Sequence, residues 1–125
     1  MDTKEGIVLI ASCEECWYES FLHGIEEESV PIYCISAENE EDIIEYDALA
    51  MATFASKYST FEIGVGADNE KIVIRHRLQK ESTPLLDIDK EDGEEIIRIQ
   101  GSNAARIVKK LPLFLADERL WKPEV

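Results

Sequence analysis

The chain has 125 residues, of which 45% are apolar and 32% are charged, with 6 glycines and 4 prolines. This length and composition are typical of one packed globular domain and exclude a disordered chain. The 27 acidic residues outnumber the 13 basic ones and give a formal net charge of −14, which disfavours nucleic acid and anionic membranes as partners, because both recruit clusters of Lys and Arg.

We expect a single domain over residues 1–125, with a core in about 6–114 and a C-terminal tail, 115–125, that is ordered in part. Trp121 is the only large apolar anchor of that tail. The longest apolar run, residues 7–11, is far shorter than the roughly 20 residues that span a bilayer. Residues 1–5 lack a signal-peptide pattern, so we expect a cytoplasmic protein.

The first 36 residues have the pattern of a βαβ unit. Residues 6–11 form a continuous apolar, mostly β-branched run, which predicts the central strand of a parallel sheet, covered on both faces. Residues 17–28 follow a helical period, and Pro31 bounds that helix. Residues 31–36 predict a second strand. The apolar face of the helix comprises Trp17, Tyr18, Phe21, Leu22 and Ile25.

The middle of the chain predicts a loop, a helix and a hairpin. The acidic residues 38–45 are typical of a solvated loop. Asp47 is expected to cap an alanine-rich helix that extends to about Tyr58. Residues 61–67 predict a third strand, and residues 71–76 predict an antiparallel fourth strand after a polar turn. This hairpin makes the sheet mixed.

The C-terminal part predicts a strand followed by a helix. Residues 84–88 indicate a short fifth strand. Residues 91–111 are expected to be mostly helical, with an interruption or kink near Gly101 and a cap or bend at Asn103. Lys109 and Lys110 suit the negative end of the helix dipole. The elements together predict an α/β fold.

The spacing Cys13-Glu14-Glu15-Cys16 is that of a redox or metal site, at a predicted junction between strand and helix. The two intervening glutamates disfavour a thiolate, and the other soft ligands, Cys34, His23 and His76, have no ligand-like spacing. An odd number of cysteines also argues against a disulfide framework. We interpret them as ordinary reduced thiols and keep a redox pair as an alternative hypothesis.

No motif in the sequence predicts catalysis. Gly64-Val65-Gly66 lacks the third glycine and the Lys-Ser/Thr pair of phosphate-binding loops, so close packing explains these glycines better. No serine has the context of a nucleophile elbow, and neither histidine has a nucleophile at a useful spacing. We therefore expect a non-catalytic chain.

The run Gly24-Ile25-Glu26-Glu27-Glu28 places three carboxylates at the C-terminal end of the first helix. The helix dipole favours cations there, so each carboxylate costs on the order of 0.3–1 kcal/mol and something should compensate. Two interpretations remain open. The three residues form a solvated face, or they meet a basic partner surface or a hard cation such as Mg²⁺.

Four segments, taken together with their order and spacing, resemble the small (β) subunit of the glycerol/diol dehydratase reactivase along about residues 6–114: residues 24–31, 63–68, 84–86 and 101–109. The resemblance implies a three-layer α/β/α sandwich. Its sheet would be mixed, mostly parallel and five-stranded, with the fourth strand antiparallel. Ser29 departs from the glycine that the family often has, and residues 87–95 are unusually acidic.

The resemblance also implies a function and partners. In that family, the small subunit joins a large ATPase subunit in a chaperone for adenosylcobalamin-dependent dehydratase. The complex exchanges subunits with the dehydratase so that damaged cobalamin can leave, and the small subunit itself neither hydrolyses ATP nor binds a cofactor alone. Glu27 matches the position that reaches an Mg²⁺ at the interface with the large subunit. The partner interface would comprise Ser20, His23, Glu26 and Glu27.

The alternative is the medium subunit of the dehydratase itself, which shares these motifs. That subunit has an N-terminal extension, and a Ser/Gly-rich stretch before its third strand meets the cobalamin. Here residues 56–60 read Ser-Lys-Tyr-Ser-Thr, so we favour the reactivase subunit. The sequence leaves open whether the dehydratase acts on glycerol or on propanediol. It also leaves open whether the protein works in a bacterial microcompartment.

Overall fold

The computed structural model describes residues 2–80 and 83–114. One sheet has the strand order β2-β1-β3-β4-β5. β1 is parallel to β2 and β3, whereas β4 is antiparallel to β3 and β5. The expected mixed sheet with an antiparallel fourth strand is confirmed, although β3, not β1, is its central strand. The strands are β1 (Ile7–Ala11), β2 (Ile32–Ser36), β3 (Ile63–Ala67), β4 (Lys71–His76) and β5 (Leu86–Asp89).

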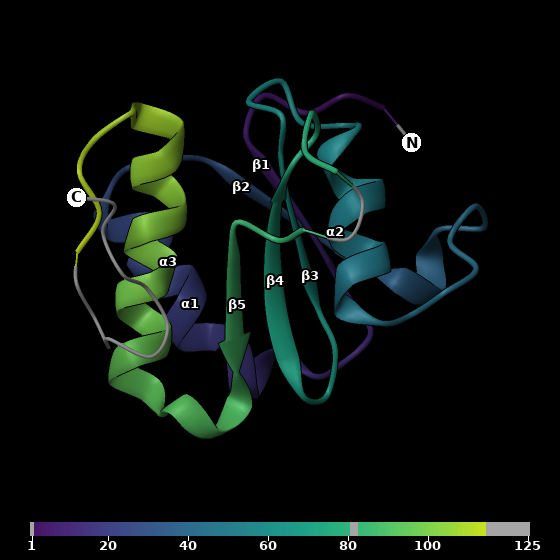
Figure 1. The fold of residues 1–125 in the computed structure, drawn as a ribbon. Coiled ribbons are helices and arrows are strands. Elements are labelled where there is room, and N and C mark those ends of the chain that lie inside the picture. Colours follow the sequence, from purple (N-terminus) through teal and green to yellow (C-terminus); the bar gives the residue numbers. More distant parts are fainter. Residues whose placement is uncertain (1, 81–82, 115–125) are drawn as a thin grey trace.

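Helices cover both faces of the sheet. α1 and α3 lie on one face and α2 lies on the other (Figure 1), so the three-layer sandwich is also confirmed. The helices are α1 (Glu15–Glu27), α2 (Ala48–Ser56) and α3 (Glu94–Lys109), with short 3-10 turns η1 (Ala37–Asn39) and η2 (Lys90–Asp92). No helix in the described part of the chain is both long and apolar enough to cross a membrane.

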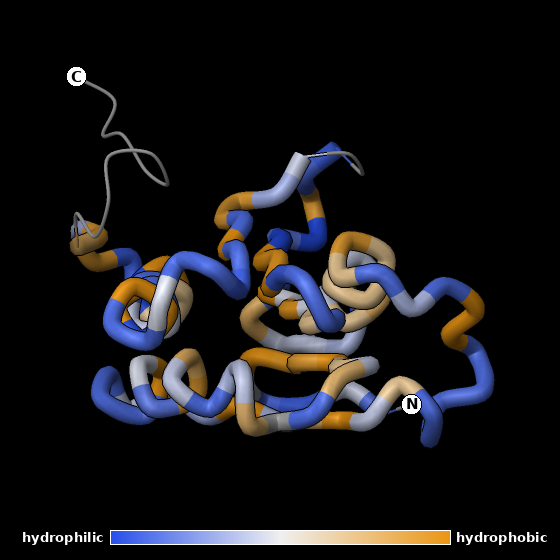
Figure 2. Tube along the Cα trace, turned by 90° about the horizontal axis from the view of Figure 1, so that it is seen from below, coloured by the Kyte–Doolittle hydropathy of each residue, from blue (hydrophilic) through white to orange (hydrophobic). Residues whose placement is uncertain are grey.

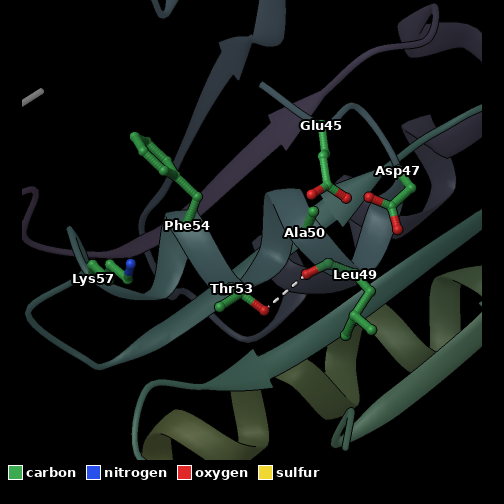
Figure 3. Close-up of a pocket in the computed structure, with 7 residues that line it drawn as sticks. All are labelled: Glu45, Asp47, Leu49, Ala50, Thr53, Phe54 and Lys57. Carbon is green, nitrogen blue, oxygen red and sulfur yellow. Dashed lines mark hydrogen bonds between the residues drawn. The ribbon is translucent and has the colours of Figure 1, made fainter. Parts of the chain in front are cut away.

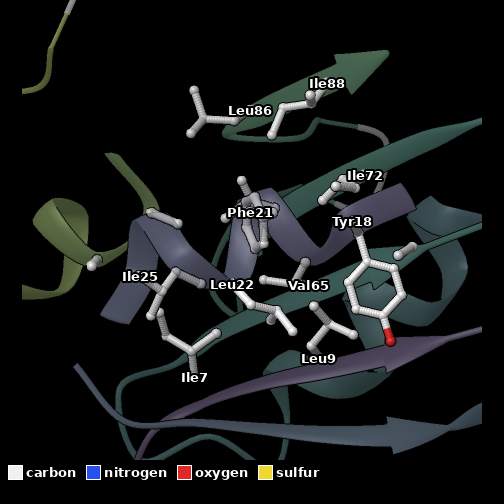
Figure 4. Packing of buried hydrophobic residues seen from close by; sticks show 14 of the residues in the cluster. Ile7, Leu9, Tyr18, Phe21, Leu22, Ile25, Val65, Ile72, Leu86 and Ile88 are labelled. Carbon is white, nitrogen blue, oxygen red and sulfur yellow. The ribbon is translucent and has the colours of Figure 1, made fainter. Parts of the chain in front are cut away.

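The core is divided by the sheet. Leu9 and Val65 face the layer of α1 and α3, whereas Val8 and Ile10 face α2. Hydrophobic segments of the chain are concentrated in the middle of the molecule (Figure 2). Phe21 of α1 is completely buried and packs against the face of the sheet that Leu9 and Val65 form (Figure 4). Burial of such a side chain stabilises the fold by about 1.5–3 kcal/mol.

Gly64 and Gly66 allow α2 to pack directly on β3. A Cβ atom at Gly66 would lie 2.0 Å from the carbonyl oxygen of Ala48, and one at Gly64 would lie 2.2 Å from the backbone nitrogen of Ser56. Backbone atoms of α2 therefore occupy the space that any side chain on these two strand positions would need. This confirms that the glycines serve close packing.

The start of α2 differs from the prediction in its capping side chain. Asp47 is at the N-cap position, but its side chain makes no capping hydrogen bond. Instead, Asp68 Oδ2 accepts from the backbone N–H of Ala48 at 2.9 Å. Its Oδ1 accepts from the N–H groups of Glu70 at 2.8 Å and Lys71 at 2.9 Å. Asp68 thus holds both the helix start and the β3–β4 turn.

Arg75 on β4 is buried, with 1% of its surface exposed. Its guanidinium donates to the carbonyl oxygens of Thr83 at 2.7 Å, Gln79 at 3.0 Å and Lys80. These bonds fasten the segment between β4 and β5 to the α2 side of the sheet. A buried charge is tolerated here because carbonyl dipoles replace part of its hydration.

α3 runs without interruption through Gly101, so the predicted break there was wrong. The glycine serves a helix contact instead, because a Cβ atom at Gly101 would lie 2.1 Å from the carbonyl oxygen of Phe21. α3 begins at Glu94, after η2, and ends at Lys109 with Lys110 in the left-handed conformation. The prediction that residues 91–111 are mostly helical is confirmed, although the α-helix itself is shorter than this range.

Asn103 is buried within α3 and is neither a cap nor a bend, so that prediction was also wrong. Its Oδ1 accepts from the N–H of Phe114 at 2.7 Å, and its Nδ2 donates to the carbonyl of Phe114 at 3.0 Å. The segment after α3 is thereby fastened to the helix up to Phe114. The predicted tail, 115–125, with Trp121, lies outside the described residues.

We predict that Asp68→Ala lowers the free energy of unfolding by about 1–3 kcal/mol, because three backbone donors lose their acceptor. Urea denaturation measures the change. The matched control, Asp47→Ala, should stay within about 0.5 kcal/mol of the unaltered protein. A larger loss for Asp47→Ala than for Asp68→Ala would show that the capping assignment is wrong.

Candidate functional site

α1 is amphipathic: one side packs against the sheet and the other carries polar side chains that are exposed or half-buried. Tyr18, Phe21, Leu22 and Ile25 are buried against the sheet (Figure 4). The residues predicted to form a partner interface lie away from this buried side. His23, Glu26 and Glu27 are exposed, and Ser20 is half-buried.

The three carboxylates at the end of α1 have different environments. Glu26 is exposed and forms no ion pair with the described residues. Glu27 pairs with Arg98 of α3, whose Nη1 lies 2.9 Å from Oε1 and 3.3 Å from Oε2. Glu28 is more enclosed, with 13% of its side chain exposed. Its Oε2 lies 3.2 Å from Arg106 Nε, and its Oε1 lies 3.8 Å from Lys109 Nζ.

Cations of α3 therefore compensate for the acidic end of α1. Lys109 Nζ also donates to the backbone carbonyl of Glu28 at 2.9 Å, which satisfies an acceptor that the helix leaves open. The expected electrostatic compensation exists, but it comes from within the chain. The helix dipole consequently gives no independent reason to require a metal or a basic partner at this end.

Two glycines bring α1 and α3 close enough for these ion pairs. A Cβ atom at Gly24 would lie 1.9 Å from the carbonyl oxygen of Arg98 and 2.7 Å from the backbone nitrogen of Ser102. Ser102 Oγ also donates to the carbonyl of Gly24 at 3.0 Å. With Gly101 against Phe21, the two helix backbones are in direct contact. This contact places Arg98 beside Glu27.

The described residues contain no group of three or more His, Cys, Asp or Glu side chains able to hold a metal ion. His23 Nε2 lies 3.6 Å from Glu19 Oε1, one helical turn away, and both side chains are more than half exposed. Glu27 is 51% exposed, and its carboxylate is the kind of hard oxygen ligand that Mg²⁺ prefers. This chain could supply one such ligand while a partner supplies the others.

Sequence reasoning did not identify Arg98, Arg106 and Lys109 as parts of this site. A signal was available in their spacing of eight and three residues, which places cations along one side of a helix. The missing information was which helix that side would meet. Pairing between α1 and α3 depends on the order of the strands, so it could not be predicted from either segment alone.

A shallow pocket of about 340 Å³ lies on the outer side of α2 (Figure 3). Thr53 Oγ1 donates to the carbonyl of Leu49 within the helix at 2.9 Å. Because the two carboxylates of the lining outnumber its one ammonium group, a phosphate-bearing ligand is disfavoured here. The lining residues are Glu45, Asp47, Leu49, Ala50, Thr53, Phe54 and Lys57.

The three cysteines, Cys13, Cys16 and Cys34, are reduced thiols. Cys13 lies in the bend between β1 and α1, and its Sγ lies 3.4 Å from the carbonyl oxygen of Ala67. Burial raises the pKa of the Cys13 thiol, the hydrogen bond with Trp17 lowers it by less, and the negative charge of Asp68 raises it a little further. A raised pKa is the opposite of what an attacking redox thiol needs.

We predict that Gly24→Ala lowers the free energy of unfolding by about 1–3 kcal/mol, because the added methyl group forces the backbones of α1 and α3 apart. Urea denaturation with intact far-UV circular dichroism checks this. Glu26→Ala, an exposed change on the same helix, is the control and should cost less than about 0.5 kcal/mol. Equal stability of the two variants would contradict a tight helix contact.

We predict that the alkylation rate of Cys13 by iodoacetamide rises to half its maximum at a higher pH than that of an ordinary exposed thiol, because burial raises the pKa of Cys13. Only the thiolate reacts, so a raised pKa moves the curve to higher pH. The measurement uses the double variant Cys16→Ser/Cys34→Ser, with N-acetylcysteine as the reference thiol. A midpoint below that of the reference would revive the redox hypothesis for Cys13 and Cys16.

Most of the chain is similar in sequence to small subunits of dehydratase-reactivating factors. The propanediol dehydratase-reactivating factor small subunit of Citrobacter freundii is 32% identical over 112 residues, covering 88% of this chain and 90% of the relative. That of Salmonella typhimurium is 30% identical and covers 85% of each chain. The diol dehydratase-reactivating factor small subunit of Klebsiella michiganensis is 28% identical and covers 86% of this chain and 80% of its own.

Two solved structures share the fold. A chain of the diol dehydratase-reactivating factor complexed with ADP and Mg²⁺ has a TM-score of 0.78 at 22% identity, covering 90% of this chain and 99% of that one. A chain of glycerol dehydratase reactivase has a TM-score of 0.79 at 24% identity, covering 91% and 100%. The resemblance to reactivase small subunits is therefore confirmed. Residues 6–114 match the family described as dehydratase medium subunit, and the chain belongs to that family.

Proposed function

We propose that this chain is the small, non-catalytic subunit of a reactivating factor for an adenosylcobalamin-dependent diol or glycerol dehydratase. The observation that carries the proposal is the match, over at least 85% of this chain and 80% of each relative, to three proteins named as reactivating factor small subunits. A further relative, from Citrobacter freundii, is named as a probable glycerol dehydratase-reactivating factor small subunit, so the proposal covers diol and glycerol dehydratases without choosing between them. The reduced cysteines suit the reducing cytoplasm, in which we place this activity, either in solution or within a microcompartment.

In this proposal, ATP is hydrolysed by a large partner subunit and this chain contributes a surface. A similar structure is a reactivating factor complexed with ADP and Mg²⁺. The small subunit would exchange with a dehydratase subunit of similar fold, which would open the dehydratase and let damaged cobalamin leave. The exposed side of α1, with Ser20, His23, Glu26 and Glu27, would be the surface that docks on the large subunit.

Glu27 is proposed to reach an Mg²⁺ that is held mainly by the large subunit. Its carboxylate suits this role, because it is half exposed and paired with a single cation in the described chain. Glu28 suits it less, because two cations of α3 already hold its largely enclosed carboxylate. A Mg²⁺ bound at this point would supply a positive charge that joins carboxylates of two subunits.

The second candidate function is the medium subunit of the dehydratase, and the description of the matching family favours it. The local structure of residues 56–60 weighs against a cobalamin contact. Ser56 Oγ donates to the carbonyl of Thr53 at 2.8 Å, and Ser59 Oγ donates to the carbonyl of Gly6. Both serines are buried. A cobalamin titration in the presence of a dehydratase large subunit separates the two functions, because only a dehydratase subunit should complete a holoenzyme.

We predict that Glu27→Ala weakens Mg²⁺-dependent co-purification with the large subunit, because a charged ligand to the shared metal is lost. Affinity capture with tagged large subunit, in MgCl₂ and in EDTA, measures the retained fraction. Glu41→Ala, which removes an exposed carboxylate from the loop before α2, is the control and should be retained as the unaltered chain is. Retention of Glu27→Ala equal to that of the unaltered chain in both buffers would rule out the metal role.

A further inference from the structure

We infer that Arg98 is an internal competitor for the Glu27 carboxylate, which holds it in the free subunit and releases it when Mg²⁺ and the large subunit bind. The inference rests on the proposed role of Glu27 and adds a regulatory part to it. The free chain would then present a Glu27 carboxylate that Arg98 neutralises. The divalent cation supplied with the partner surface would replace the arginine as its counter-ion.

The geometry of the pair makes Arg98 and Mg²⁺ compete for the same carboxylate. Arg98 Nη1 contacts both oxygens of Glu27, at 2.9 Å and 3.3 Å, and therefore occupies the space between them. An Mg²⁺ ligand must approach to about 2.0–2.1 Å. A metal on this carboxylate would thus stand next to the guanidinium, and the repulsion between two cations at such a distance favours departure of the arginine side chain.

The release needs only a change of side-chain rotamer. The backbone of Arg98 is fixed, because its carbonyl oxygen lies where a Cβ atom at Gly24 would be. Its side chain is 40% exposed, so the guanidinium can turn into solvent while α3 stays in place. The neighbouring pair is different, because Glu28 and Arg106 expose only 13% and 21% of their side chains. Lys109, the second cation on Glu28, is 41% exposed, but Arg106 would keep that carboxylate paired. Of the two paired carboxylates, Glu27 is therefore the one that a side-chain rotation alone can free.

The ion pair between Arg98 and Glu27 should be weak enough for Mg²⁺ to replace the arginine, and strong enough for its removal to change the Kd measurably. Ion pairs at such exposure contribute about 0.2–1 kcal/mol, which corresponds to a factor of about 1.4 to 5 in an equilibrium constant. Arg98→Gln removes the competing charge and should lower the Kd for the large subunit in MgCl₂ by this factor. Arg98→Lys keeps the charge without the planar fork and should lie between the two.

The chain offers a matched control in a second exposed pair. Arg77 Nη2 lies 2.6 Å from Glu62 Oε1, and the two side chains are 40% and 33% exposed. Arg77→Gln removes the same positive charge from the chain at a similar exposure, but away from α1. It should leave the Kd unchanged, which excludes a general effect of net charge on assembly.

Isothermal titration calorimetry with purified large subunit, in MgCl₂ and in EDTA, tests the inference on Arg98→Gln, Glu27→Ala and the double variant, after thermal melts confirm that each is folded. We expect tighter binding for Arg98→Gln in MgCl₂ only. In the Glu27→Ala background the same change should have no effect, because the competition acts through that carboxylate.

The outcomes separate the inference from the function beneath it. If Glu27→Ala binds as well as the unaltered chain in both buffers, the metal role fails and the competition falls with it. If Glu27→Ala binds more weakly but Arg98→Gln does not bind more tightly, only the competition is overturned. Weaker binding of Arg98→Gln in both Glu27 backgrounds would instead show that the arginine itself contacts the large subunit.

Discussion

Backbone contact between α1 and α3 is the constraint on which the candidate site depends. Gly24 and Gly101 each leave room for a carbonyl oxygen of the other helix, and the cations of α3 thereby reach the acidic end of α1. Without this contact, three consecutive carboxylates would stand uncompensated at the negative end of a helix dipole. With this contact, Glu27 and Glu28 are paired with cations of α3. The two pairs differ in how easily another cation could replace the first.

Local patterns were enough to predict most of the fold. The apolar run of β1, the helical period of α1 and the turn at Asp68 each contain their own signal within a few residues, and the elements formed as expected. The errors arose where a local signal had a distant cause. Gly101 looks like a helix breaker in the sequence, whereas it is a contact point with α1. Asp47 has the position of an N-cap, but Asp68 provides the capping oxygen from the other end of β3.

The candidate site was predictable in its acidic half only. The sequence indicated that Glu27 stands at an unfavourable helix end and that a positive charge should be near. It could not indicate Arg98, which is 71 residues further along the chain and meets Glu27 only after the sheet has set the positions of both helices. A metal ligand shared between subunits is equally invisible within one chain, because the rest of its coordination belongs to another surface.

The proposed function joins these parts. A small subunit that belongs to the family described as dehydratase medium subunit, and whose acidic helix end would exchange its counter-ion as we propose, would be suited to binding and leaving a partner. The most direct measurement is reactivation of a dehydratase that carries damaged cobalamin, by large subunit, ATP and Mg²⁺, with and without this chain. The account predicts restored activity only when the chain is present. Full reactivation without it, or a holoenzyme formed from this chain and the dehydratase large subunit, would contradict the account.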